Sequence, residues 1–220
     1  MEIFHHHIPK AGGTYIKSAL LDPLVYAHGV EGHELFTTGS QQHYGWKDVD
    51  DETFVISSIR EPMRRLVSHY THIRTQIMDD YFTFDEWLDE YEVALTNYQS
   101  KMFVYSWDGV PPVPLNDLNT KPIEVDGELV RTNVKRVDVL LRDNQLNGET
   151  LEDVRKAICT RFDLPDLINA KYTMPNYNAN TQSQLTFNSL SYSQVKRLQK
   201  MTEADSEIYM DNSLFWKQGQ

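Results

Sequence analysis

Residues 3–20 read IFHHHIPKAGGTYIKSAL and combine three local signals in one short stretch. The apolar and aromatic residues within Glu2–Ile8 predict a short buried strand, which Pro9 ends. The segment Ala11-Gly12-Gly13-Thr14 is too flexible for a helix interior. The pattern over Tyr15–Leu21 predicts the first turns of a helix. This stretch therefore predicts a strand, a glycine-containing turn and a helix in direct succession.

A turn of this kind is suited to holding a phosphate group. Glycines let the backbone come close to a ligand, and the first amides of a helix point outward without partners. Lys10 adds a positive charge beside those amides, and Thr14 adds a hydroxyl. The P-loop pattern G-x-x-x-x-G-K-[ST] is not met, because the lysine precedes the glycines and the loop is shorter. An ordinary strand-to-helix turn is the alternative interpretation.

Three consecutive histidines, His5, His6 and His7, lie within the predicted strand. Successive strand residues point to opposite faces of a sheet, so we expect His5 and His7 on one face and His6 on the other. Such an arrangement does not bring all three side chains to a single metal ion. The sequence therefore predicts no metal site at this position.

The second informative stretch, residues 53–74, reads TFVISSIREPMRRLVSHYTHIR. Its β-branched beginning, Thr53–Ile59, predicts a central strand, and Pro62 suits the first turn of a helix. The helix has an apolar stripe and, on the opposite side, a polar face. The stripe consists of Met63, Leu66, Tyr70, Ile73 and Ile77, and the polar face includes Arg64, Ser68, Thr71 and His72.

Arg60 ends this predicted strand, at the edge of an open α/β sheet where ligands bind. An arginine there and the hydroxyl of Ser68 on the polar helix face can hold a phosphate through charge-assisted hydrogen bonds. In the alternative interpretation, Arg60 is a surface ion-pair partner of Glu61, and Ser68 is a solvated helix residue.

Elsewhere in the chain, predicted strands alternate with predicted helices, which indicates an α/β class with a mostly parallel sheet. Proline residues predict a loop over 106–133, in which Asp126-Gly127 signals a hairpin. A further loop is expected over 172–190, and residues 1–220 are expected to form a single domain. Further strands are predicted at Leu24–Ala27 and Val137–Leu141, and further helices at Thr83–Val93, Asn97–Tyr105, Glu149–Phe162 and Ser193–Met210.

The chain of 220 residues is acidic, with 21 Lys and Arg against 32 Asp and Glu and a formal net charge of −11. This charge disfavours a nucleic-acid partner, which normally binds a basic face, but it allows a local basic pocket. The one cysteine, Cys159, excludes an intramolecular disulfide and fits a reducing compartment. Neither a membrane span nor a signal peptide is indicated, so we expect a cytoplasmic protein.

Both informative stretches resemble motifs of the sulfotransferases. The segment HIPKAGGTYIKSAL (7–20) resembles their 5′-phosphosulfate loop, and IREPMRRLVSHYTHIR (59–74) resembles their 3′-phosphate motif. The order of the motifs, their strand–loop–helix settings and their separation are also similar. The likeness is greatest to the carbohydrate sulfotransferases related to heparan sulfate 2-O-sulfotransferase. One departure is Glu61, where the family commonly has an aspartate.

This resemblance implies a P-loop-like three-layer fold with a central, mostly parallel sheet flanked by helices. It implies 3′-phosphoadenosine-5′-phosphosulfate (PAPS) as the sulfuryl donor and its desulfated form, PAP, as a product. Arg60 and Ser68 are expected to hold the 3′-phosphate, and Lys10 is also expected to act in catalysis. The 5′ side of the donor is expected to be held by Lys10, Ala11, Gly12, Gly13, Thr14 and Tyr15.

The acceptor side is less specified by the sequence. Members of the related branch place a catalytic histidine in a Gly-His pair between the two motifs, which corresponds here to Gly32-His33. Imidazole has a pKa near working pH, which suits a general base, and Glu31 and Glu34 are the alternatives. The net charge disfavours a polyanionic acceptor, so a carbohydrate or another small hydroxyl compound is expected. Without an anchor or disulfides, a bacterial or viral origin is expected.

Two other functions remain open at this stage. A non-catalytic protein that binds PAP or another nucleotide would keep the donor site without needing a base. A nucleotide-dependent phosphotransferase would need a P-loop lysine and magnesium ligands, and the sequence shows neither arrangement. Turnover without a metal ion would separate a sulfotransferase from a phosphotransferase.

Overall fold

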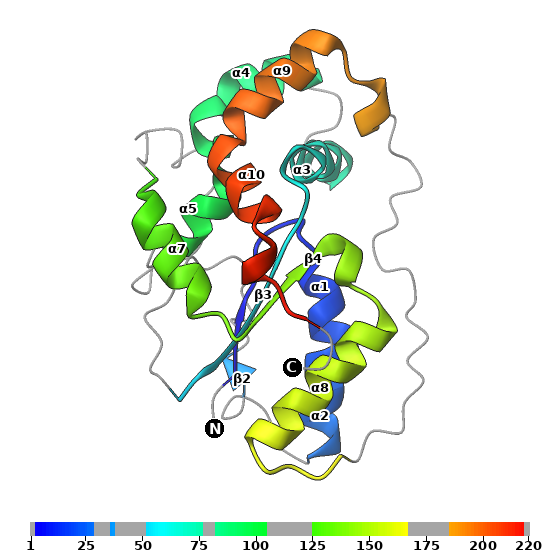
Figure 1. The fold of residues 1–220 in the computed structure, drawn as a ribbon. Coiled ribbons are helices and arrows are strands. Elements are labelled where there is room, and N and C mark those ends of the chain that lie inside the picture. Colours follow the sequence, from blue (N-terminus) through cyan, green and yellow to red (C-terminus); the bar gives the residue numbers. More distant parts are fainter. Residues whose placement is uncertain are drawn as a thin grey trace.

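A four-stranded parallel sheet lies at the centre of the fold (Figure 1). The computed structural model describes residues 3–28, 36–37, 52–76, 82–104, 125–166 and 185–217. The spatial order of the strands is β2-β1-β3-β4. Their bounds are Ile3–His6 for β1, Phe36–Thr37 for β2, Phe54–Ile59 for β3 and Val139–Arg142 for β4. The expected α/β class, with helices flanking a parallel sheet, is confirmed in this general form.

Helices cover both faces of this sheet. One face packs against α5 (Tyr98–Val104), α7 (Gly127–Lys135) and α10 (Glu203–Met210). The other face packs against one continuous helical segment and against α8 (Gly148–Arg161). The continuous segment consists of α1 (Gly13–Ile16), the π-helical η1 (Lys17–Leu21) and α2 (Asp22–Ala27). Alternation along the strands divides the core accordingly, with Phe4, Val55 and Leu140 on the first face and Ile3, Ile56 and Leu141 on the second.

A third apolar cluster lies beyond the carboxyl ends of the strands and joins α3 (Pro62–Gln76), α4 (Phe84–Leu95) and α9 (Tyr192–Met201) (Figure 1). The predicted stripe of α3 supplies Leu66, Tyr70 and Ile73 to it, and Trp87 of α4 is 1% exposed at its centre. Thr83 and Glu86 form a capping box that starts α4, at the residue where the sequence predicted a helix to begin. This cluster holds α3 against the rest of the molecule at the edge where β3 ends.

Three predictions about secondary structure are wrong. Leu24–Ala27 lies in α2 and not in a strand, because Asp22 and Pro23 begin a helical turn whose Leu24 packs into the core. Asp126-Gly127 forms no hairpin, and residues 127–133 of the loop predicted over 106–133 are helical, because the Asp126 carboxylate accepts the amides of Glu128 and Leu129 and caps α7. The last predicted helix is divided between α9 and α10 at Thr202.

The other predicted strands and helices are present with small shifts in their ends. Of the predicted loops, residues 106–124 and 172–184 lie outside the described residues, and Phe187–Ser189 forms a short 3₁₀ helix, η3. Among the described residues, no helix is both long enough and apolar enough to cross a bilayer.

Candidate functional site

The strand order reverses between β1 and β3, which are neighbouring parallel strands. The chain leaves β1 through α1, η1 and α2 on one face and reaches β2, whereas from β3 it reaches β4 on the opposite side. Loops that diverge at such a point leave a crevice outside the carboxyl ends of the strands, where ligands of open α/β sheets bind. Lys10 follows β1 and Arg60 follows β3, so both lie at this crevice.

Two residues of the loop after β1 have left-handed backbone conformations. Lys10 has φ 65° and Gly12 has φ 101°. A Cβ on Gly12 would overlap the side chain of Leu146, and a Cβ on Gly13 would overlap the ring of His7. Tyr15 N makes the first helical hydrogen bond, to Gly12 O at 2.9 Å. The glycines therefore let the loop turn tightly into α1 while packed against two side chains.

A buried arginine from α3 braces the same loop from behind. Arg65 is 1% exposed, and its Nε donates to the carbonyl oxygen of Pro9 at 3.0 Å. Its Nη2 lies 3.1 Å from His69 Nδ1, and its guanidinium lies 3.8 Å from the ring centre of Tyr98. Burial lowers the pKa of Arg65 to about 10. This arginine ties the β1–α1 loop to α3 just before Lys10.

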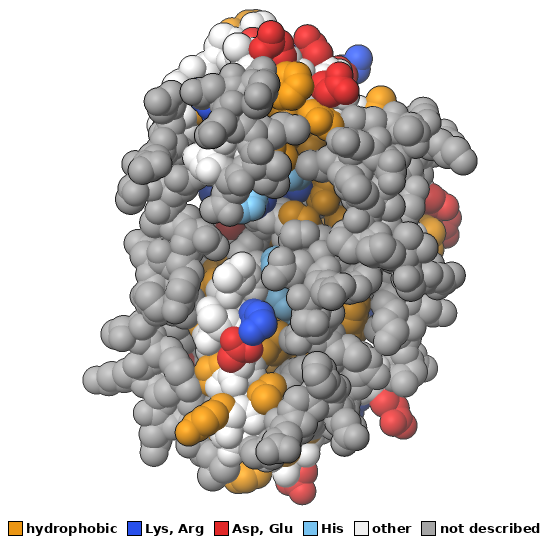
Figure 2. Space-filling view, turned by 180° about the vertical axis from the view of Figure 1, so that it is seen from behind, with side chains coloured by type: hydrophobic (Ala, Val, Ile, Leu, Met, Phe, Trp, Pro, Cys, Tyr) orange, Lys and Arg blue, Asp and Glu red, His pale blue; other side chains and the backbone are white. Residues whose placement is uncertain are grey.

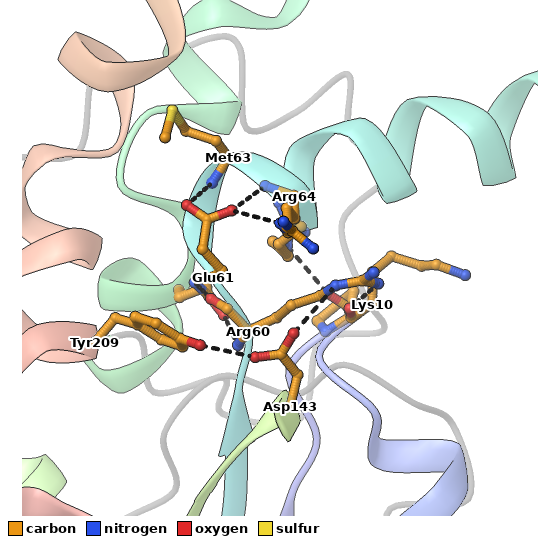
Figure 3. Close-up of polar contacts among 10 residues, drawn as sticks. Lys10, Arg60, Glu61, Met63, Arg64, Asp143 and Tyr209 are labelled. Atoms are coloured by element: carbon orange, nitrogen blue, oxygen red, sulfur yellow. Dashed lines mark hydrogen bonds and ion pairs between the residues drawn. The ribbon is translucent and has the colours of Figure 1, made fainter. Parts of the chain in front are cut away.

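Glu61 starts α3 as a cap and does not form the ion pair with Arg60 that the alternative interpretation assumed. Its carboxylate accepts the amides of Met63 at 3.3 Å and Arg64 at 2.8 Å (Figure 3). Arg60 instead lies with its Nε 3.7 Å from Asp143, while its Nη1 donates to Lys10 O at 3.5 Å. Glu61, at the position where the sulfotransferase motif commonly has an aspartate, thus caps the start of the helix.

A cavity of about 300 Å³ opens along the polar face of α3. It brings together Lys10 from the first loop and Arg60, Arg64 and Ser68 from the second stretch, and none of its described lining residues is acidic. Figure 2 shows the molecule from behind, where a few basic and histidine side chains are visible in the middle among grey atoms, the lower of them beside an acidic side chain. The lining comprises Lys10, Arg60, Arg64, Val67, Ser68, Thr71, His72, Leu185, Thr186 and Phe187.

The electrostatics of the cavity favour an anion. Burial and the positive charges of Arg60 and Arg65 lower the pKa of Lys10 from its ordinary value. Burial and Lys10 likewise lower the pKa of His72. A site that disfavours its own positive charges in this way gains from a bound negative charge. Phosphate and sulfate groups are the anions that such a set of donors holds best.

The structure brings three of the predicted site residues, Lys10, Arg60 and Ser68, into this cavity. Ala11 is 1% exposed in the core, and Gly12, Gly13, Thr14 and Tyr15 form the adjoining turn without lining the cavity. The proposed base His33 and its alternatives Glu31 and Glu34 lie outside the described residues.

Sequence reasoning placed Arg64, Thr71 and His72 on the polar face of α3 but gave them no role in a site. Their helical spacing from Ser68 was the signal that could have placed them in the cavity. Leu185 to Phe187 were missed, because nothing in the sequence indicates that this distant segment closes the cavity. Arg64 lies 5.7 Å from the ring centre of Phe187, which joins that segment to α3.

His5 and His6 in β1, and His7 directly after it, divide between the two faces of the sheet, as the strand pattern predicted. The rings of His5 and His7 stack with centres 5.3 Å apart, whereas His6 packs against Phe103 at 4.7 Å on the other face. Among the described residues, no group of three or more His, Cys, Asp or Glu side chains is placed to hold a metal ion.

Comparison of the chain with protein-family models, with curated proteins and with solved structures finds no match. The geometry of the cavity and the two sequence motifs are therefore the observations that bear on function.

Proposed function

We propose that this chain is a PAPS-dependent sulfotransferase with a P-loop-like fold, which moves a sulfuryl group from PAPS to a hydroxyl of a carbohydrate or another small acceptor. One observation carries the proposal. Lys10 and Arg60, fifty residues apart in sequence, line a single cavity with Ser68 at the switch point of the sheet. These are the positions that the two sulfotransferase-like motifs would assign to the donor.

The charge of the cavity supports a donor with several phosphate groups. The chain carries a net charge of −11, yet the described cavity lining has three cationic side chains and no acidic one. A nucleotide with separate 5′ and 3′ phosphates presents two anionic centres to such a lining. The volume of about 300 Å³ is at the lower end of ligand pockets, which is consistent with a compact nucleotide portion.

Each residue has a distinct role in this proposal. Arg60 and Ser68 hold the 3′-phosphate, and Arg64 adds positive charge from one turn away on the same face. Lys10 lies against the 5′-phosphate, which gains negative charge as its bond to the sulfuryl sulfur breaks, and stabilises that charge. The acceptor oxygen forms the new bond to sulfur, and its proton passes to a base, for which His33 remains our prediction.

Calorimetric titration with PAP and with 5′-AMP tests the donor site. A charge-assisted contact of ~1.5–3 kcal/mol to the 3′-phosphate corresponds to at least a tenfold preference for PAP. Arg60→Ala is expected to remove most of that preference while leaving 5′-AMP binding little changed. Equal affinities of the unmodified protein for the two nucleotides would contradict the proposal.

Transfer of label from [³⁵S]PAPS to a panel of sugars and small alcohols tests the reaction itself. Labelled product that forms with a chelator present supports metal-independent sulfuryl transfer and excludes a magnesium-dependent phosphotransferase. Tight binding of PAP without transfer to any acceptor would instead favour a nucleotide-binding protein that lacks catalysis.

A further inference from the structure

The main chain of Arg60 is held by a side chain from another helix. Gln99 of α5 is 1% exposed, and its Oε1 accepts the amide of Arg60 at 2.9 Å. Its Nε2 donates to the carbonyl oxygen of Arg60, also at 2.9 Å. The one amide group therefore satisfies both backbone polar groups of this residue.

Arg60 needs such a partner because of where it lies in the chain. The last paired position of β3 with β4 is Ile59, opposite Arg142, and α3 begins only at Pro62. Arg60 is thus past the end of the sheet and before the helix, so neither the hydrogen bonds of the sheet nor those of the helix hold its backbone. Gln99 takes the place that a neighbouring strand would have.

The guanidinium of Arg60 is held less closely than its backbone. Its two described contacts, to Lys10 O at 3.5 Å and to Asp143 at 3.7 Å, are both long. The Nε atom is buried and has no hydrogen-bond partner among the described residues. The position of the backbone therefore decides where in the cavity this side chain can reach.

Gln99 is itself held by a buried carboxylate from α10. Asp205, 2% exposed, accepts the amides of Gln99 at 3.1 Å and Ser100 at 2.7 Å, and the hydroxyl of Ser100 at 2.6 Å. These are among the first amides of α5, so Asp205 caps that helix from outside it. The carboxylate, the helix end and the glutamine form one chain of contacts that ends at Arg60.

We propose that Gln99, held in place by Asp205, is a positioning residue that sets Arg60 in the cavity for binding of the 3′-phosphate of the donor. The proposal rests on the function proposed above. It makes α5 and α10, neither of which lines the cavity, part of the donor site. A residue that serves only stability would affect all nucleotides alike, whereas one that positions Arg60 affects only ligands that Arg60 binds.

The test is a double-mutant cycle on nucleotide affinity with PAP and 5′-AMP as probes. Gln99→Ala is expected to weaken PAP binding about three- to tenfold and 5′-AMP binding less than twofold. In an Arg60→Ala background, Gln99→Ala is expected to have no further effect on PAP, because the group it positions is gone. Asp205→Asn is expected to reproduce the selective loss of PAP affinity.

Asn133→Ala is the matched control. Its Nδ2 donates to Phe103 O at 2.6 Å from a buried position on α7, away from Arg60. This variant is expected to lose thermal stability comparable to that of Gln99→Ala and to retain the preference for PAP. If Asp205→Asn does not fold, the Gln99→Ala cycle alone decides the question.

Three results would overturn the proposal. Equal loss of PAP and 5′-AMP affinity in Gln99→Ala would make Gln99 a stability residue. Additive effects of Gln99→Ala and Arg60→Ala on PAP would show that Gln99 acts independently of Arg60. If the unmodified protein does not prefer PAP, the proposed function fails together with this inference, whereas the first two results leave the proposed function standing.

Discussion

The two halves of the candidate site are built by different means. The half after β1 depends on backbone shape, with left-handed conformations at Lys10 and Gly12 and close packing of Gly13 against His7. The half after β3 depends on a regular helix, whose start is capped by Glu61 and whose polar face carries its side chains to the cavity.

This difference indicates what each half can tolerate. A loop held in a left-handed conformation and braced by a buried arginine has few alternative shapes, so small changes to its backbone are expected to be costly. A helix face presents side chains one turn apart, and replacing one of them leaves the others in place. The first half should therefore respond to substitutions as a unit, and the second residue by residue.

The largest effect is expected from Lys10→Ala, measured on sulfuryl transfer. If Lys10 stabilises charge that develops on the leaving phosphate, kcat is expected to fall by ~10²–10³. PAP affinity is expected to fall much less, because the ground state carries less charge at that position. Steady-state kinetics and calorimetry on the same variant measure both quantities. An unchanged kcat with a raised KM would show that the lysine only binds the donor.

The buried histidines His6 and His7, at the end of β1, are expected to make the protein less stable in acid. Burial, partly opposed by a hydrogen bond to Met102 O, lowers the pKa of His6 from 6.5 to about 4. Burial and Lys10 lower the pKa of His7 to about 4 as well. The unfolded chain then binds more protons between pH 6.5 and 4, so stability is full above pH 6.5 and falls as the pH drops through this window.

Chemical denaturation at pH 7 and pH 5 measures this loss, for which His6 alone can account for up to about 3 kcal/mol over the whole window. His6→Phe removes the titrating group from a fully buried position and is expected to reduce the difference between the two pH values. His72→Asn, at a more exposed position on α3, is the control and is expected to change it less. An unchanged pH dependence in His6→Phe would contradict the assignment.

A smaller effect is expected when the packing of the first loop is disturbed. Gly13→Ala places a Cβ against the ring of His7, so that either the ring or the loop must move, and a loss of ~1–3 kcal/mol in the free energy of unfolding is expected. Gly127→Ala is the matched control, because nothing lies within 4 Å of its Cβ at the start of α7. Equal unfolding free energies for the two variants would show that the loop is less constrained than its geometry indicates.

The sequence predicted the second half of the site better than the first. The spacing of Leu66, Tyr70 and Ile73 defined the buried face of α3, so the position of Ser68 on the opposite, polar face followed from helix geometry alone. The glycines after β1 indicated a close turn, but not which side chains pack there, because Leu146 and Arg65 come from distant parts of the chain. Such long-range contacts have no local signal in a single sequence.

The same reason explains why Gln99 was overlooked. Its side chain points away from its own helix to a backbone segment 39 residues earlier, and no spacing within α5 indicates this. The hairpin prediction at Asp126-Gly127 was wrong for a different reason. An aspartate before a glycine is favourable both in a hairpin turn and at the start of a helix. Only the packing of Val130 and Val134 into the core decides between the two.

The smallest effect concerns the carboxylate next to the second half of the site. Asp143 lies 3.7 Å from Arg60 Nε and accepts a hydrogen bond from the Tyr209 hydroxyl at 3.0 Å. Because both members of the ion pair are partly exposed, their interaction is worth ~0.2–1 kcal/mol. A 3′-phosphate bound as proposed would compete with this carboxylate for Arg60. Asp143→Asn is therefore expected to raise PAP affinity by about two- to fivefold, measured by calorimetry.

Tyr209→Phe is the control for this last prediction, since it removes the hydroxyl but leaves the charge of Asp143 in place. It is expected to change PAP affinity less than Asp143→Asn does. Raising the salt concentration should reduce the gain from Asp143→Asn, because screening weakens the competition between the carboxylate and the phosphate. If Asp143→Asn instead weakens PAP binding, the carboxylate orients Arg60 toward the donor, and the second half of the site is braced by a neighbour just as the first is.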